Sequence, residues 1–287
     1  MEYFKIGDQH YLAVANFYDR ASYRQNSVIY QWNLSQEQFV VFQSIETFGA
    51  HSFNFFEITN EQFLAISNYR DDSSRYINSF IYKWNSIIKF QKIQEIATER
   101  AVSSETFVIS NETFIAFANH GTPQKQYSVQ AAVFKWSGQQ FVKLQCFQTY
   151  GALDVKSFSD NGSTFLAFAN YRHGEQHNIN SPIYKWNGSH FVLFQSIRTR
   201  GAAALHPFMM CSQTFLGVAN HHDDDNGYNT MSVVYRVSQE QVIEYQEIPT
   251  QGASRMTSFQ YKGHTYLAVA NRYSNKSNIN SALYKWA

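Results

Sequence analysis

The chain has 287 residues, of which 23 are Lys or Arg and 22 are Asp or Glu, so its formal net charge is +1. That near-neutral balance excludes the usual nucleic-acid binder, which presents a basic face to phosphates. Aromatic residues make up 17% of the chain, which is typical of a large folded core, and no apolar run reaches the roughly 20 residues of a membrane helix.

A short apolar stretch that ends in asparagine recurs along the chain at intervals of 50 to 52 residues. Its six copies are residues 11–16, 63–68, 114–119, 165–170, 215–220 and 266–271. A second motif follows each copy and ends in tryptophan, except that Val237 takes this position in the fifth copy. All five tryptophans occupy this one position, so the chain is built from six repeats of about 51 residues.

Each repeat contains four short runs of β-branched and aromatic residues separated by turn signals. In the fourth repeat these runs are residues 155–159, 165–170, 182–186 and 191–197. The longest connection follows the second run, and the dipeptide Asn187-Gly188 marks the last hairpin. Six such repeats predict an all-β fold, a six-bladed β-propeller with four antiparallel strands per blade and a single domain spanning residues 1–287.

The two ends of the chain set an expectation for the last blade. The chain begins with an inner strand at residues 2–6 and stops after a third strand at residues 281–286, so only five fourth strands are available. We therefore expect a three-stranded last blade and a ring closed by packing of blade faces. The unpaired edge of residues 281–286 would pair with a second copy, so we also expect a homodimer.

An aromatic stripe runs along the third strand, with Tyr184 and Trp186 two residues apart and therefore on one face. Such a stripe is either a platform on which sugars stack or part of the core between blades. Large aromatic side chains are mostly buried, and we interpret the stripe as core.

Three motifs that recur in order resemble the epilepsy-associated repeat family, also called EAR or EPTP. In the fourth repeat they are residues 165–170, 181–186 and 197–202, the last reading Ile-Arg-Thr-Arg-Gly-Ala. The resemblance covers nearly the whole chain and implies a propeller of an extracellular protein that binds other proteins. A free-standing chain of six repeats is also similar to sponge galactose-binding lectins that form six-bladed propellers.

In a propeller, the loops after strands two and four share one face, and the loops after strand two are the longer ones here. Long loops on a rigid scaffold carry function, and their side chains can stack on a sugar and bond its hydroxyls. The residues expected to bind ligand are Asn16, Tyr18, Asp19, Asn68, Tyr69, Arg70, Asp71, Asn170, Tyr171, Arg172, His173, Asn220, His221, His222, Asp223, Asn271, Arg272 and Tyr273. The alternative for the asparagines is that each caps its strand through hydrogen bonds to the loop.

Metal sites are not expected. The loop at residues 222–227 lacks the acid positions of an EF-hand, with His222 and Val233 where Asp and Glu are needed. Related propellers can hold calcium through acids just after the Gly-Ala of the inner strand, but only Asp154 supplies one. His173, His177 and His206 lie near one another in sequence with no spacing that fixes a ligand geometry. We expect no cofactor either.

The sequence suggests three functions to compare. The main hypothesis is a secreted, multivalent carbohydrate-binding lectin that favours a galactose-type sugar and binds glycans or glycoproteins. The alternative is an EAR-family propeller that binds a protein ligand through one asymmetric patch. An enzyme is rejected, because catalysis needs one special site and no G-x-S-x-G, H-E-x-x-H or P-loop motif occurs. We expect no nucleic-acid partner and no membrane span.

Overall fold

The computed structural model describes residues 1–121, 124, 127–274 and 279–286. The chain divides into two compact units: unit 1 comprises Met1–Thr122 and Ala131–Cys146, and unit 2 comprises Pro123–Gln130 and Phe147–Ala287. Each unit is described by itself below, and the single domain predicted from the repeats stays a prediction. Within the described ranges, no helix is both long and apolar enough to cross a bilayer.

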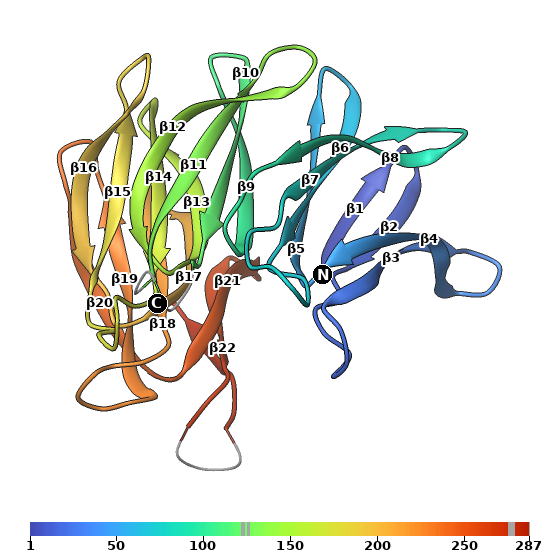
Figure 1. The fold of residues 1–287 in the computed structure, drawn as a ribbon. Coiled ribbons are helices and arrows are strands. Elements are labelled where there is room, and N and C mark those ends of the chain that lie inside the picture. The colour runs from blue at the N-terminus through green and yellow to red at the C-terminus, as the bar shows by residue number, and fades with distance from the viewer. Residues whose placement is uncertain (122–123, 125–126, 275–278, 287) are drawn as a thin grey trace. The chain divides into compact units, whose positions relative to one another are not determined.

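Unit 1 contains three antiparallel sheets of four strands, each with its strands in chain order (Figure 1). The first sheet consists of β1 (Glu2–Ile6), β2 (Gln9–Val14), β3 (Arg24–Asn33) and β4 (Gln38–Phe48). The second consists of β5 (Ala50–Ile58), β6 (Glu61–Asn68), β7 (Ser79–Asn85) and β8 (Lys89–Ile96). The third consists of β9 (Ala101–Ile109), β10 (Glu112–Asn119), β11 (Ser128–Trp136) and β12 (Phe141–Tyr150), and the last two of these strands cross the unit boundary.

Unit 2 contains two further four-stranded sheets and one sheet with three strands among the described residues. The fourth sheet consists of β13 (Ala152–Asp160), β14 (Ser163–Asn170), β15 (Asn180–Trp186) and β16 (Phe191–Arg198). The fifth consists of β17 (Ala202–Met210), β18 (Gln213–Asn220), β19 (Asn229–Val237) and β20 (Val242–Gln251). The sixth consists of β21 (Ala253–Tyr261), β22 (His264–Asn271) and β23 (Ala282–Lys285). This all-β set of six antiparallel sheets confirms the six-bladed propeller class and the three-stranded last blade.

Every sheet contains the same aromatic pair, formed by a side chain of the first strand and its cross-strand neighbour on the second, although Phe259 of the sixth sheet is exposed. Phe158 of β13 and Phe165 of β14 illustrate it: their ring centroids are 5.4 Å apart and their planes 13° apart. The equivalent pairs, 5.3 to 5.6 Å apart, are Phe4–Tyr11, Phe56–Phe63, Phe107–Phe114, Phe208–Phe215 and Phe259–Tyr266. The repeated apolar stretch thus builds one repeated packing unit, with an aromatic contact beyond plain area burial.

The tryptophans of the third strands pack onto neighbouring sheets of their unit. Trp136 lies 5.4 Å from Phe63 of the preceding sheet, and Trp286 lies 5.8 Å from Phe215 of the preceding sheet. In the stripe itself, Tyr184 lies 4.7 Å from Phe147 and Trp186 lies 5.0 Å from Phe191, so both rings pack against other aromatic side chains, as the core interpretation predicts. In the fifth sheet, the cross-strand neighbours Val237 and Val242 are both buried where the fourth sheet has Trp186 and Phe191.

Five of the hairpins between first and second strands use two-residue turns in which both residues have positive φ. In the β13–β14 turn these residues are Asn161 (φ 45°) and Gly162 (φ 80°), the dipeptide that such a turn favours. In the β17–β18 turn they are Cys211 (φ 48°) and Ser212 (φ 60°), which adopt the left-handed conformation at a cost in strain. The repeat therefore imposes one turn geometry on unequal sequences.

Replacing Cys211 and Ser212 with Asn and Gly should raise the free energy of unfolding by about 1 kcal/mol, because the left-handed strain of the turn is relieved. The matched control makes the reverse exchange, Asn161→Cys with Gly162→Ser, and should lower it by a similar amount. Urea unfolding curves check both, and unchanged midpoints in both variants would show that turn strain does not limit stability.

Candidate functional site

The asparagine that ends β6, β14, β18 or β22 joins its own loop to the end of the preceding sheet. In unit 2, Asn170 donates from Nδ2 to the carbonyl oxygen of Asn180 (2.8 Å) and accepts at Oδ1 from the backbone N–H of Tyr150 (2.9 Å). Equivalent pairs of bonds are made by Asn68 to Asn78 and Phe48, by Asn220 to Met231 and Arg200, and by Asn271 to Asn280 and Gln251. Asn16 makes the loop bond to Asn26. The side chains proposed as ligands thus make the strand-capping contacts of the alternative interpretation.

The aspartates three positions after these asparagines are used locally as well. Asp19, Asp71 and Asp223 each accept two backbone N–H groups from residues two and three positions further on. This is the turn that an aspartate makes with its own loop. The bonds from Ser22 and Ala21 hold the pKa of Asp19 below its ordinary value.

Four pairs of side chains join neighbouring loops, and we call them the loop pairs. Each consists of a residue late in one loop and the residue two positions after the asparagine of the next sheet. The pairs are Tyr23–Arg70 in unit 1, with the guanidinium carbon 4.5 Å from the ring centroid, and, in unit 2, Tyr127–Arg172 (4.1 Å), His177–His222 (4.3 Å between centroids) and Tyr228–Tyr273 (5.3 Å). Arg over tyrosine is a cation–π contact, so two of the four loop pairs tie the loops together by this interaction.

A glycine at the start of the next inner strand lies against each loop pair. Gly201, with φ +57°, donates its N–H to the carbonyl of His177 (2.7 Å), and a Cβ there would meet the His222 carbonyl oxygen at 3.0 Å. Gly49, Gly151 and Gly252 make the same bond to Tyr23, Tyr127 and Tyr228. The Gly of the Gly-Ala motif is therefore required twice, by its positive φ and by this close approach.

The other expected ligand residues lie around the loop pairs. In unit 1, Tyr18 stacks on Tyr23 with centroids 4.5 Å apart, and Tyr69 lies under the guanidinium of Arg100. In unit 2, Tyr171 is partly buried against His177, and burial raises its pKa. His173 packs on Tyr150, His221 donates from Nδ1 to the Gly252 carbonyl, and Arg272 lies over Tyr273.

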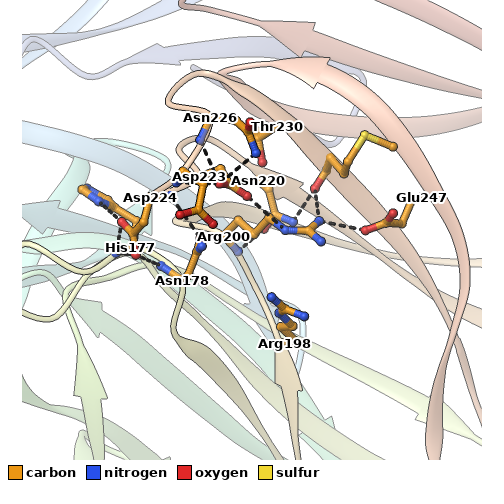
Figure 2. A network of polar contacts seen from close by, with 12 residues as sticks. His177, Asn178, Arg198, Arg200, Asn220, Asp223, Asp224, Asn226, Thr230 and Glu247 are labelled. Atoms are coloured by element: carbon orange, nitrogen blue, oxygen red, sulfur yellow. Dashed lines mark hydrogen bonds and ion pairs between the residues drawn. The ribbon is translucent and has the colours of Figure 1, made fainter.

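A polar network in unit 2 joins the loop after β18 to the strand ends beside it (Figure 2). Arg200 is central: its Nε lies 3.2 Å from the Asp223 carboxylate and its Nη1 lies 2.8 Å from Glu247. The backbone N–H of Arg200 also donates to Asn220. The Arg200 side chain keeps only 18% of its surface exposed. This network anchors the loop and neutralises Asp223.

A second cluster in this network is formed by His177, His222 and Asp224. One ring nitrogen of each histidine and one Asp224 oxygen all lie within 4.8 Å of one another. Burial, and the neighbouring His222, lower the pKa of His177, so its imidazole is neutral at pH 7. Within the part of the chain that the structure describes, this is the one cluster with the side chains and spacing of a metal site.

The other residues that the sequence analysis considered as metal ligands make different contacts. Asp154 is buried, accepts the N–H of Leu205 and pairs with Arg255 at 3.4 Å. His206 lies on β17, where its Nε2 accepts the backbone N–H of Ser258 (2.8 Å). His177 is thus grouped with His222 and not with His173 and His206.

Arg200, Tyr228 and Asp224 are site residues that the sequence analysis did not single out. The sequence indicates them only by their position in the repeat. Arg200 directly precedes the Gly of the Gly-Ala motif, and Tyr228 occupies the position of Tyr23 and Tyr127. Aligning whole repeats, and not only the openings of the loops, would have found them.

The EPTP domain family matches residues 1–33, 38–85, 89–137, 140–187 and 243–287. The chain belongs to the EPTP domain family. The matched segments leave out residues 188–242, the part of this EPTP chain that contains Val237, His222 and Asp224. The fifth repeat therefore departs most from the family pattern, and it carries two of the three residues of the cluster, His222 and Asp224.

Two relatives are the human and mouse thrombospondin-type laminin G domain and EAR repeat-containing proteins. They are 35% and 36% identical to this chain over an alignment 286 positions long, and the alignment covers 95% of this chain. The chain spans 42% of the length of each relative.

Solved structures of similar fold include the N-terminal domain of Nup159, with a TM-score of 0.52 and 13% identity over 94% of this chain and 72% of that chain. A hypothetical selenium-binding protein from Sulfolobus tokodaii has a TM-score of 0.55 and 7% identity over 86% of this chain and 65% of that one. At these identities the likeness concerns the fold alone.

Replacing Asn170 with Ala should lower the free energy of unfolding by about 1–3 kcal/mol, because the Tyr150 N–H and the Asn180 carbonyl lose their partner. The matched control is Asn229→Ala, at an exposed asparagine in the same unit, and should change it by less than about 0.5 kcal/mol. Denaturant titration measures both, and equal effects would refute a special role for the strand-ending asparagines.

Acid should destabilise the chain through His206. Burial, and then the charge of Lys156, lower its folded pKa, while Asp154 opposes them. The stability that its neutral ring contributes is therefore complete above the unfolded pKa of about 6.5 and is lost as the pH falls toward the folded pKa. Urea unfolding at pH 7.5 and pH 5.0 should show a smaller loss for His206→Gln than for the unaltered chain. Equal losses would assign the acid sensitivity to other groups.

Proposed function

We propose that this EPTP chain is a binding module whose ligand is another protein, held by the loops that follow the second strands. The observation that carries the proposal is that the polar groups shared by these loops are already used inside the molecule. The asparagines hold strand ends, the aspartates hold turns, and the arginines lie over tyrosines. A ligand meets the side chains that remain exposed.

Those exposed side chains differ from one loop to the next. The loops of unit 1 expose Tyr18 (46%) and Tyr76 (61%). In unit 2, Tyr273 is exposed (44%), and the loops of the fourth and fifth sheets expose the acids Glu175 and Asp225. Within each unit, loops that differ in this way suit an irregular protein partner, and tyrosine is a residue type that often carries binding energy at protein interfaces.

Membership in the EPTP family supports the same proposal, since the family resemblance implies extracellular proteins that bind proteins. We accordingly propose an extracellular location and no catalytic role. The relatives are more than twice as long as the match, so the partners of those whole proteins are not transferred to this chain.

Carbohydrate binding of a multivalent, galactose-type lectin is the second candidate. What favours it is the exposure of the Tyr18 ring in unit 1 and of the Tyr273 ring in unit 2, each in a polar loop, since a sugar site combines an aromatic face with hydrogen-bonding groups. Equivalent sites around the molecule would need equivalent free groups, and the shared groups are engaged. We therefore rank it below protein binding.

The test is a parallel screen of the chain against recombinant extracellular protein ectodomains and against a glycan array. For a protein ligand, the charge reversals Glu175→Lys and Asp225→Lys should weaken binding at least about tenfold if these acids lie within the contact. The matched control is Glu240→Lys, an exposed acid in the turn between β19 and β20, and it should leave binding unchanged.

The lectin hypothesis would replace protein binding if the chain bound the glycan array, free galactose abolished that binding, and the protein screen found no ligand. A protein ligand that binds the loop variant and the Glu240→Lys control equally would move the contact away from these loops.

A further inference from the structure

One of the four loop pairs differs in chemistry from the rest. Tyr23–Arg70, Tyr127–Arg172 and Tyr228–Tyr273 consist of tyrosines with arginine or with each other. His177–His222 consists of two imidazoles, and the carboxylate of Asp224 lies beside them. This change converts a stacking contact into a set of metal-ligand side chains.

We propose that His177, His222 and Asp224 bind one divalent transition-metal ion, and that Zn²⁺ is the ion that suits them best. Two imidazole nitrogens and one carboxylate oxygen form a donor set of the kind that zinc takes in proteins. The site is additional to the protein-binding function proposed above and does not depend on it.

The distances fit this assignment. Two donors bound at about 2.0–2.1 Å to a tetrahedral ion lie roughly 3.3 Å apart. Nδ1 of His177 and Oδ1 of Asp224 are 3.2 Å apart. The His222 ring lies 4.3 Å from the His177 ring at an angle of 43°, and one of its nitrogens lies within 4.8 Å of the donor atoms of the other two residues.

His222 also carries a nitrogen that the protein leaves unsatisfied. Its Nδ1 is inaccessible to solvent and has no hydrogen-bond partner among the described residues. A buried polar atom without a partner destabilises the folded protein. A metal ion bound at this atom would give it a partner and remove this destabilisation.

The backbone holds the carboxylate in position. Asp224 accepts the N–H groups of His177 and Asn178 at 2.9 Å (Figure 2). Asp72 of unit 1 accepts the N–H of Tyr23 at 2.8 Å in the equivalent place. An acid beside the loop pair is therefore part of the repeat's construction, and hydrogen bonds of this kind orient metal ligands. In this one loop pair, histidines stand beside the acid in place of tyrosine and arginine, and they complete the proposed set of metal ligands.

A bound ion would join the loop of the fourth sheet to that of the fifth through coordinate bonds. Three protein donors leave one position of a tetrahedral ion for water or for a donor of a partner. Asp224 keeps 30% of its side-chain surface exposed, so this position is reached from solvent.

The test uses the full chain after dialysis against EDTA, titrated with ZnCl₂ by calorimetry and with CoCl₂ by visible absorption. We expect one ion per chain, the absorption of tetrahedral Co²⁺ with nitrogen and oxygen donors, and a rise in melting temperature. The double variant His177→Tyr, His222→Arg copies the Tyr23–Arg70 pair, so it should fold and lose the site. Asp224→Asn should weaken binding at least about tenfold.

The matched control changes two exposed histidines elsewhere, His190→Tyr with His264→Arg, and should bind zinc as the unaltered chain does. The reciprocal variant Tyr23→His, Arg70→His builds the same donors beside Asp72 and should bind a second ion. Absence of binding at millimolar zinc, or equal binding by the His177→Tyr, His222→Arg variant, would overturn the proposal.

Discussion

One amide side chain determines how the loops of this molecule are held. At the end of β6, β14, β18 and β22, an asparagine ties its own loop to the last strand of the sheet before it. Because the same side chain serves both connections, the loop and the neighbouring sheet cannot shift independently. The glycine contacts and the loop pairs adjoin this connection, so the loop end of each unit depends on it.

This arrangement changes how a repeated motif is interpreted. Recurrence of Asn, Asp and Arg at the loop openings suggests repeated ligand sites, yet Asn170, Asp223 and Arg172 are engaged in contacts within the protein. Differences between the repeats therefore carry the information about ligands. The fifth repeat is the clearest case, because His222 and Asp224 lie in the segment that the family matches leave out.

The sheets were predictable because their signals are local and repeated. The spacing of asparagine and tryptophan determines the six sheets, and the turn dipeptides separate the strands. The site was less predictable, because its partners lie about one repeat apart: Asp224 is 47 positions from the backbone N–H of His177 that it accepts. Grouping His173, His177 and His206 by closeness in sequence placed together side chains that the sheets separate. Only the repeat register brings His177 to His222.

The paired valines of the fifth sheet bear on how such a chain can diverge. Val237 and Val242 face each other across β19 and β20, where the fourth sheet pairs Trp186 with Phe191. Restoring the tryptophan alone would force extra volume into a filled space, and restoring the phenylalanine alone would do the same. An exchange of segments between repeats must therefore transfer both strands of this hairpin. The hairpin, and not the single strand, is the smallest unit that can be exchanged.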